Sequence, residues 1–229
     1  MKTLICIPAH NEEDNIAEII RACQKYGEVL VIDDGSTDNT FEIALQTALV
    51  IHNPPGSQYG DGFIQGCEWA LYKNGIQVVF MNAGGSHFPE DIPRLLKGLE
   101  GNDMVIGSRI LRHSVCRQPL IRRPLTYLAT RFLGLLVGEK RVDYSSFRAF
   151  NYWAMVVAYD LAKSLPKETR LFNPLLTYKL YKSGLKIKQA PISYRAINNQ
   201  LHLEKFIQVA WILLKYMIRS KRLNIGSNR

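Results

Sequence analysis

The chain has 229 residues, and its 29 lysines and arginines against 20 aspartates and glutamates give a formal net charge of +9. This length allows one large domain or two small ones around a sizeable core, and fixed-period repeats and low-complexity tracts are absent. The basic excess lies between Arg109 and Arg229. It favours anionic partners, namely phosphorylated small molecules, acidic phospholipids or nucleic acids.

The first half alternates apolar strand-like runs with helical stripes. Strands are predicted over residues 3–8, 29–32, 48–52, 77–81 and 103–107. Helices are predicted over residues 12–26, 37–48, 62–72 and 89–99. Repeated β-α units of this kind predict an α/β fold whose central sheet is mostly parallel, with helices on both faces.

The second half is less regular and contains a strongly apolar segment. Helices are predicted over residues 120–138, 151–164 and 172–183, with a strand in residues 186–194. Residues 203–218 are apolar but include Gln208, and they are too short for the roughly 20-residue span that a bilayer needs. Two interpretations stay open for this segment. It is either a terminal helix packed on the core or an amphipathic helix in the membrane interface, where Trp211 and Tyr216 would suit the headgroup layer.

The four cysteines, Cys6, Cys23, Cys67 and Cys116, show neither CxxC spacing nor an accompanying histidine pattern. We therefore expect reduced thiols rather than disulfides or a zinc site. The short apolar run at the N-terminus is followed by polar residues and is too brief for a secretory signal. These features predict a cytoplasmic protein, peripheral on the cytosolic face of a membrane.

Two adjacent carboxylates, Asp33 and Asp34, follow the second predicted strand. Ligands of open α/β sheets bind at the carboxyl ends of strands, where acidic side chains can accept hydrogen bonds from ribose hydroxyls or a nucleobase N–H. The alternative is that one of the two merely caps the helix that begins near Thr37. The pair alone does not decide between these interpretations.

Several motifs, taken in order, carry a family resemblance. They are Ile7-Pro8-Ala9-His10-Asn11-Glu12-Glu13, Val31-Ile32-Asp33-Asp34-Gly35-Ser36-Thr37-Asp38, and residues 60–71, 81–96, 105–109, 143–150 and 190–194. Together they resemble the family 2 glycosyltransferases with the GT-A fold, and more closely the dolichyl- or polyprenyl-phosphate sugar synthases. The resemblance implies a Rossmann-like GT-A domain over residues 1–202. Its nucleotide-binding half would be residues 1–110 and its acceptor half residues 111–202, followed by an amphipathic helix and basic tail over 203–229.

The resemblance also implies a nucleotide-sugar donor, linked to UDP or GDP. The residues implied to cradle its base and ribose are Pro8, Ala9, Glu12 and Asp34, with Asp33 nearby. In the family, the loop after the fourth strand carries an Asp-x-Asp motif that holds Mg²⁺ or Mn²⁺ on the diphosphate.

This chain departs from that metal motif. Asn82 and Gly84 replace the two aspartates, and Ser86 stands where a third ligand is often found. Without a carboxylate, a hard cation loses the charge that offsets its dehydration, so no tight metal site is predicted. The three residues are kept as substrate-binding candidates, and a weak Mg²⁺ or Mn²⁺ site completed by substrate phosphates is the most that they allow.

Fixed cations are one explanation of the lost metal motif. Arginines on or beside family motifs are predicted to be catalytic, namely Arg109, Arg123, Arg131 and Arg148. Guanidinium groups bind phosphate bidentately and can stabilise a leaving diphosphate. The implied reaction moves a hexose to a polyprenyl or dolichyl phosphate, or a similar lipid acceptor. Its phosphate oxygen is already anionic, so no general base is required.

The competing explanation is a catalytically degenerate protein that binds nucleotide-sugars or regulates a partner of the same fold. The family's basic acceptor loop appears here as residues 196–202, which have lost their cations. Peripheral contact with an anionic membrane is expected, and the sequence leaves open whether a separate membrane subunit anchors the chain. A nucleic-acid partner is not expected, because the basic residues accompany apolar helices and no nucleic-acid-binding motif is present.

Overall fold

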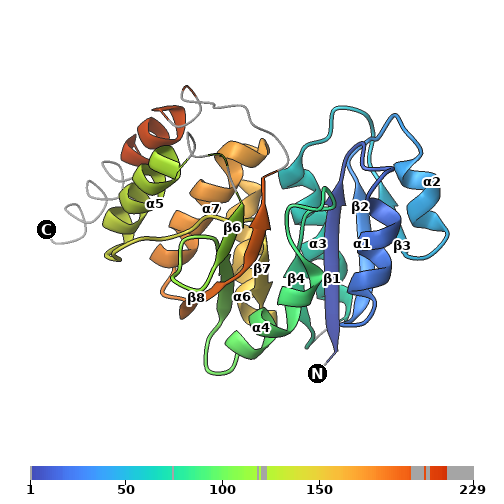
Figure 1. The fold of residues 1–229 in the computed structure, drawn as a ribbon, viewed down its shortest axis with the longest axis horizontal. Helices are drawn as coiled ribbons and strands as arrows, with labels where there is room; N and C mark the ends of the chain where they lie inside the picture. The colour runs from blue at the N-terminus through green and yellow to red at the C-terminus, as the bar shows by residue number, and fades with distance from the viewer. Residues whose placement is uncertain are drawn as a thin grey trace, which may run out of the picture.

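The computed structural model describes residues 2–73, 75–117, 119, 123–196, 204 and 207–215. Its centre is a seven-stranded sheet of order β3-β2-β1-β4-β7-β5-β8 (Figure 1). The strands are β1 (Thr3–Ala9), β2 (Glu28–Asp33), β3 (Leu49–His52), β4 (Gln77–Phe80), β5 (Met104–Ser108), β7 (Arg148–Phe150) and β8 (Ile187–Pro191). Only β7 is antiparallel to its neighbours, β4 and β5.

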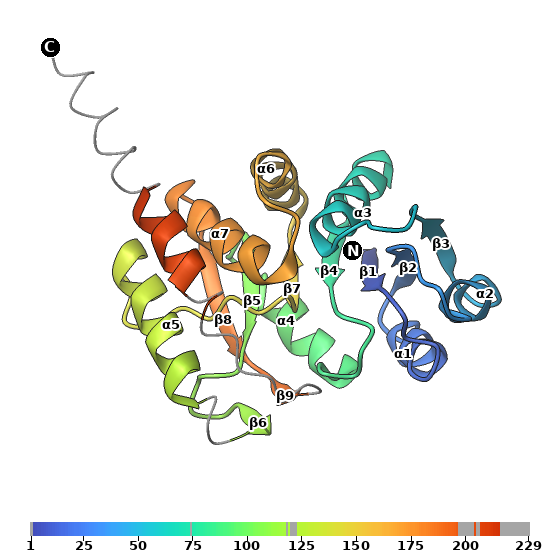
Figure 2. The same cartoon turned by 90° about the horizontal axis from the view of Figure 1, so that it is seen from above.

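Helices cover both faces of this sheet, which confirms the predicted fold class. They are α1 (Ile16–Cys23), α2 (Thr40–Leu45), α3 (Tyr59–Lys73), α4 (Ile92–Gly98), α5 (Arg123–Val137), α6 (Tyr152–Lys163) and α7 (Thr169–Lys182). A short 3-10 turn, η1 (Pro89–Asp91), leads into α4. Figure 2 shows α1 and α4 on one face and α3, α6 and α7 on the other.

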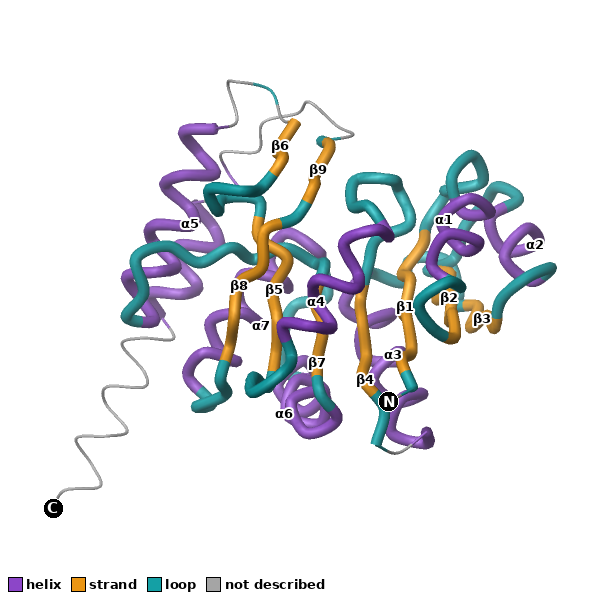
Figure 3. The backbone as a smooth tube through the Cα atoms, turned by 60° about the horizontal axis from the view of Figure 1, so that its bottom comes forward, coloured by secondary structure: helices purple, strands orange, loops and turns teal. Residues whose placement is uncertain are grey.

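Two strands form a second sheet that was not predicted from the sequence, although the strand predicted in residues 186–194 overlaps the second of them. They are β6 (Val115–Arg117) and β9 (Ser193–Arg195), which pair in parallel beyond the ends of β5 and β8 (Figure 3). The strand β7 was missed as well. Each of the three has only three residues, too few for a periodic pattern to appear, so long-range pairing rather than local sequence defines them.

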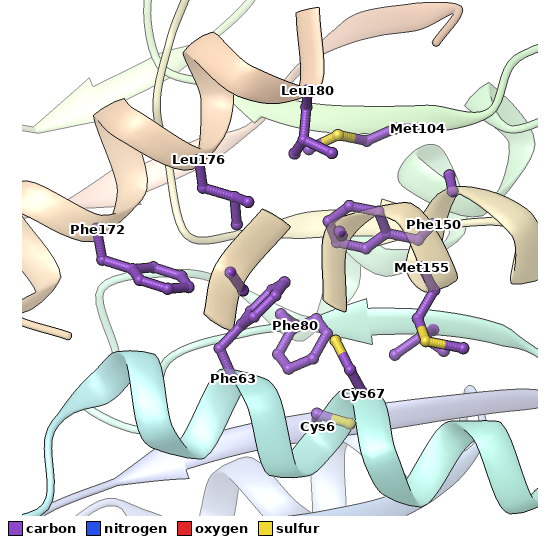
Figure 4. Packing of buried hydrophobic residues seen from close by; sticks show 14 of the residues in the cluster. Cys6, Phe63, Cys67, Phe80, Met104, Phe150, Met155, Phe172, Leu176 and Leu180 are labelled. Atoms are coloured by element: carbon purple, nitrogen blue, oxygen red, sulfur yellow. The ribbon is translucent and has the colours of Figure 1, made fainter. Parts of the chain in front are cut away.

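The sheet separates two hydrophobic cores. Along β1, Leu4 and Cys6 face the core under α3, α6 and α7, whereas Ile5 and Ile7 face the core under α1 and α4. Figure 4 shows the first of these cores, in which the rings of Phe63 on α3 and Phe80 on β4 stack with centroids 4.3 Å apart. Burial on both faces accounts for the continuous apolar runs of the strands.

Glycines let α3 approach the sheet closely. A Cβ on Gly66 would lie 2.8 Å from a ring carbon of Phe80 and 3.1 Å from the Cys6 sulfur. At the start of α3, a Cβ on Gly60 would lie 2.8 Å from the Lys167 Cα. The helix therefore begins directly against the α6–α7 connection, beside the carboxyl ends of β1 and β2.

The cysteines of the cores are packing groups. Cys6, Cys23 and Cys67 are buried, and burial raises the pKa of the Cys23 thiol to about 12. Cys116 is only partly buried, in β6. The three buried thiols are therefore protonated at neutral pH and contribute as small apolar side chains.

The helix formed by residues 207–215 lies beside α5 and α7 (Figures 1 and 2). Its Leu213 is buried in the first core, while Ile207 and Trp211 are exposed. The burial of Leu213 agrees with the core-packed interpretation, and the interfacial interpretation stays a prediction. None of the described helices combines the length and apolar character needed to span a bilayer. The predicted acceptor-loop residues 197–202 and the tail from 216 onward lie outside the described residues.

Candidate active site

The loops after β1 and β2 meet at the carboxyl end of the sheet and are joined by hydrogen bonds. The Asp34 N–H donates to the Ala9 carbonyl over 2.8 Å, and the Glu12 N–H donates to Thr40 Oγ1 over 2.7 Å. Asn11 turns the first loop with a φ of 54°, a conformation that asparagine tolerates. The structure thereby brings together the predicted donor-binding residues of both loops, Pro8, Ala9, Glu12, Asp33 and Asp34.

Asp33 is fully buried and its carboxylate is occupied by neighbouring protein groups. It accepts hydrogen bonds from the N–H and hydroxyl of Ser36, and one of its oxygens lies 2.7 Å from His52 Nδ1. The His52 ring in turn lies against Phe41, with centroids 4.5 Å apart. Asp33 therefore fixes the shape of the loop and acts as a positioning residue rather than as a free carboxylate for ribose.

Asp34 directly follows β2 at the carboxyl end of the sheet, and only 5% of its surface is exposed. Asn53 Nδ2 donates to it over 3.1 Å. A Cβ on Gly62 would lie 2.9 Å from Asp34 Oδ1, so the glycine leaves the space that the carboxylate occupies. Burial, more than any neighbouring charge, raises the pKa of Asp34 to about 7. Such perturbed carboxylates cluster at functional sites.

Sequence reasoning missed the amide pair that supports Asp34. The side chains of Asn53 and Gln65 exchange two hydrogen bonds, of 2.7 Å and 2.6 Å. Asn53 directly follows β3, at the strand end where ligands bind. This position could have identified it as a candidate site residue from the sequence. Gln65 carried no signal, because only the packing of α3 brings it to the site.

The loop after β4 offers poor ligands for a divalent cation. Asn82 Oδ1 is buried without a partner among the described residues, and Gly84 has no side chain. His87 is buried and its Nε2 lies 3.3 Å from Ser145 Oγ, and burial lowers the pKa of His87 to about 3, so the ring is neutral. Within the described ranges, no group of three or more histidine, cysteine or acidic side chains is arranged so that it could hold a metal ion. The loop does not fit a tight Mg²⁺ or Mn²⁺ site.

A hollow of about 620 Å³ lies between β5, β6 and the start of α5. Three arginines contribute cationic groups to its wall, namely Arg109, Arg123 and Arg141. Apolar surface comes from Ile110, Pro124 and Tyr127. Cationic and apolar surfaces thus meet in one concave site. The structure brings two of the four predicted catalytic arginines, Arg109 and Arg123, to this hollow.

Arg109 is held in place by a buried ion pair. Its Nε and Nη2 atoms bond the two carboxylate oxygens of Asp143 at 3.1 Å and 2.5 Å, and its backbone N–H donates to the same carboxylate at 2.7 Å. The guanidinium also lies 5.1 Å from the Tyr194 ring centroid. Burial by itself would raise the pKa of Asp143, but the neighbouring Arg109 has the strongest lowering effect and holds that pKa below its ordinary value. This pairing fixes the position of the guanidinium at the hollow, and the Asp143 carboxylate balances its charge.

Arg148 and Arg131 do not occupy the places predicted for them. Arg148 is fully buried, and its guanidinium donates to carbonyl oxygens and to Thr177 Oγ1. In this position it cannot contact a ligand. It is a structural residue that connects β7 to α7 through hydrogen bonds. Arg131 lies further along α5 and donates to the Lys140 carbonyl over 2.9 Å, away from the hollow. Both departures arise because helix register and burial, not motif position, decide where a side chain points.

Arg141 is the arginine that sequence reasoning missed. Its guanidinium stacks on the Tyr127 ring at 4.6 Å and donates to Thr130 Oγ1, so two residues of α5 hold it at the hollow. Its position two residues before Asp143, next to the motif of residues 143–150, was the only sequence signal.

Residues 4–151 match the family model described as Glycosyl transferase family 2. The chain belongs to glycosyl transferase family 2. Among curated relatives, it is 30% identical over 207 residues to polyprenol monophosphomannose synthase of Mycolicibacterium smegmatis, covering 84% of this chain and 77% of the relative. It is 28% identical over 205 residues to undecaprenyl-phosphate mannosyltransferase of Micrococcus luteus, covering 85% of this chain and 84% of that protein.

Solved structures support the GT-A-like fold of this family 2 chain. Glucosyl-3-phosphoglycerate synthase from Mycobacterium tuberculosis, crystallised with UDP, superimposes with a TM-score of 0.65 at 24% identity. That match covers 93% of this chain and 79% of the other. Mannosyl-3-phosphoglycerate synthase from Rubrobacter xylanophilus gives a TM-score of 0.64 at 16% identity. That match covers 98% of this chain and 75% of the other. At these identities the likeness establishes the fold.

In this family 2 chain a line of ring contacts connects the arginine hollow to the loop after β4. Arg109 lies against Tyr194, whose ring centroid is 5.7 Å from that of His87. Backbone hydrogen bonding also pairs Tyr194 with His87 in an antiparallel bridge. The hollow and the loop after β4 are therefore parts of one connected region.

Proposed function

We propose that this chain transfers a hexose from a UDP- or GDP-linked sugar to a polyprenyl or dolichyl phosphate, without a bound metal ion. The observation that carries the proposal is the arginine hollow with its apolar wall, connected by ring contacts to the loop after β4 of a family 2 chain. Relatives named for polyprenol and undecaprenyl phosphate substrates support the same acceptor class.

The donor half of the proposal rests on the loops at the carboxyl ends of β1 and β2. There the Asp34 carboxylate and the loop through Glu12 offer acceptors for a nucleobase N–H and ribose hydroxyls. Asn82 and Ser86, on the loop after β4, lie where the sugar diphosphate would continue from the nucleoside. Because burial holds the pKa of Asp34 near 7, its hydrogen-bonding state changes close to neutrality.

The acceptor half of the proposal rests on the hollow. A lipid phosphate has an anionic head and a hydrocarbon tail. Arg109, Arg123 and Arg141 match the head by charge, while Ile110 and Tyr127 offer apolar surface to the first part of the tail. Guanidinium groups suit phosphate because their N–H donors form a planar fork.

The proposed reaction needs no proton transfer from the acceptor. An anionic phosphate oxygen of the lipid attacks the anomeric carbon of the hexose. The bond from that carbon to the diphosphate oxygen breaks, and the nucleoside diphosphate leaves with the electron pair. The hexose is thereby joined to the lipid phosphate with inversion at the anomeric carbon. Fixed arginines stabilise the charge that moves onto the leaving group.

We expect transfer to survive chelation of divalent cations. The full chain would be incubated with UDP- and GDP-sugars and undecaprenyl or dolichyl phosphate, once with Mn²⁺ and once with EDTA, and lipid-linked hexose measured. Turnover within about twofold in the two buffers is the expected result. Binding of a nucleotide-sugar without turnover in either buffer would support the degenerate binding or regulatory protein instead.

We also propose that the chain works as a peripheral protein on the cytosolic membrane face, with a separate membrane subunit as a further anchor. Exposed apolar side chains on α5 and on the neighbouring 207–215 helix support this placement. They are Tyr127, Leu128, Leu135, Ile207, Trp211 and Leu214. Arg131 and Lys215 lie on the same two helices and would be attracted to anionic headgroups.

Flotation with lipid vesicles tests this placement. We expect the chain to float with vesicles containing phosphatidylglycerol. The bound fraction of the Leu128→Glu/Leu135→Glu variant should be at least about fivefold lower, because the variant removes apolar area that the membrane would bury and adds negative charge. Trp153→Glu on α6 is the matched control, since Trp153 is 73% exposed but on a different helix. Equal flotation of the three proteins, or none by the unmodified chain, would contradict the placement.

A further inference from the structure

We propose that Arg195 on β9 and Arg117 on β6 bind the diphosphate of the donor in place of a divalent cation. The inference rests on the proposed function and names the groups that supply the missing positive charge. Neither arginine lines the hollow assigned to the acceptor. Both belong to the small sheet that long-range pairing creates beside the loop after β4 (Figure 3).

The guanidinium of Arg195 lies over the loop that has lost its carboxylates. Its Nη2 is 3.5 Å from the point where a Cβ on Gly85 would be, and Asn15 Oδ1 is 3.8 Å from the same point. Gly85 has a φ of +66°, which disfavours any side chain there and keeps the space above the loop open. A guanidinium therefore lies at the loop segment where the family carries its metal.

Arg117 stands beside Arg195. The parallel register of β6 and β9 pairs the two residues directly, so their side chains leave the same face of the small sheet, roughly 5 Å apart at the backbone. Both side chains are exposed, and neither forms an ion pair with a carboxylate among the described residues. Like charges directly opposite each other repel, and an anion bound between them removes that repulsion.

The backbone around the arginine pair is anchored to the loop after β4 and to η1. The Arg195 N–H donates to the Ser86 carbonyl over 3.0 Å, and the Ser193 N–H donates to Asp91 Oδ2 over 2.6 Å. The Ala196 N–H then donates to the Arg117 carbonyl over 2.9 Å. The two strands are thus held against the site before any ligand arrives, as a preorganised charge requires.

Calorimetric binding of UDP and GDP to the full chain in EDTA tests the proposal. Arg195→Gln and Arg117→Gln are each expected to weaken binding of the nucleoside diphosphate that the unmodified chain prefers by about tenfold to a hundredfold, as for the loss of a charge-assisted hydrogen bond. Binding of the matching nucleoside, which lacks phosphate, should change by less than about twofold. Arg21→Gln, which removes an exposed arginine of α1, is the matched control and should bind like the unmodified chain.

A metal-restoring variant provides the reverse test. Asn82→Asp and Gly84→Asp reinstate the two carboxylates, and Gly84, unlike Gly85, is not at a positive φ. Combined with Arg117→Gln and Arg195→Gln, they are expected to recover nucleoside diphosphate affinity in Mn²⁺ and not in EDTA. The unmodified chain should show the same affinity, within about twofold, in both buffers.

Three results would overturn the inference. They are unchanged affinity of both single arginine variants, an affinity of the unmodified chain that rises at least tenfold with Mn²⁺, and a restored loop that shows no Mn²⁺ dependence. An unmodified chain that binds neither nucleosides, nucleoside diphosphates nor nucleotide-sugars would instead overturn the proposed function. Thermal unfolding of each variant distinguishes loss of binding from loss of fold.

Discussion

Asp143→Ala is expected to destabilise the fold by about 3–5 kcal/mol, because it leaves the Arg109 guanidinium largely buried without its counter-charge. Asp143 is fully buried and accepts hydrogen bonds from both the side chain and the backbone N–H of Arg109. Urea unfolding at pH 7 measures the loss. A change below about 1 kcal/mol would contradict this account of the pair.

A second variant separates stability from function. Arg109→Met/Asp143→Leu replaces the buried pair by apolar groups of similar size, a change that is often neutral for stability. We expect it to recover most of the lost unfolding free energy but not the hexose transfer, since the hollow would lack the Arg109 guanidinium. Recovery of both would remove Arg109 from the proposed acceptor site.

The pH dependence of this pair follows from the lowered pKa of Asp143. A carboxyl group with a folded-state pKa below its unfolded value stabilises the fold above the unfolded value, which is about 3.9. That contribution is lost as the pH falls through the folded-state pKa. The stability difference between the unmodified chain and Asp143→Ala should therefore be constant from pH 7 to about pH 5 and shrink in stronger acid.

Asp34→Asn is expected to stabilise the fold at pH 8 by about 2–4 kcal/mol and to leave it nearly unchanged at pH 4. The pKa of Asp34 is raised from 3.8 to about 7 by burial, and each pKa unit corresponds to about 1.4 kcal/mol. The folded state therefore holds a proton that the unfolded state has released. Its stability is highest below pH 3.8 and decreases as the pH rises to about 7.

Urea unfolding of both proteins between pH 4 and pH 8 measures this effect. The asparagine retains an oxygen that can accept from Asn53, so the hydrogen-bond geometry is preserved while the charge is removed. Asp14→Asn, at an exposed position near the start of α1, is the control and should show no such pH-dependent gain. A stability difference between the two proteins that does not vary with pH would contradict the raised pKa.

The same variant should lose nucleotide affinity. A buried ionised carboxylate costs stability, and proteins retain such groups where function uses them. If Asp34 accepts a hydrogen bond from the donor nucleoside, Asp34→Asn will bind the nucleotide less tightly at pH 8 although it is the more stable protein. Greater stability together with unchanged nucleotide binding would indicate that Asp34 has no role in the donor site.

Much of the arrangement at the strand ends was predictable from the sequence. The apolar runs of β1 and β2 identify two buried strands, and their order places the residues that follow them at one end of a parallel sheet. Pro8, Ala9, Asp33 and Asp34 are therefore neighbours for reasons that local sequence contains. The loss of the metal motif at Asn82 and Gly84 was equally visible, because it concerns residue type alone.

The positions of the cations were not predictable in this way. Arg148 lies in a family motif, yet it is enclosed by α7. The sequence did not predict a group formed by Arg141, Arg117 and Arg195. Only the turn after α5 brings Arg141 to the hollow, and only the β6–β9 register brings Arg117 and Arg195 to the loop after β4. Local patterns determine which segments become strands and helices and where the strands end. Long-range pairing and burial decide which charges converge, because these depend on contacts between residues far apart in the chain.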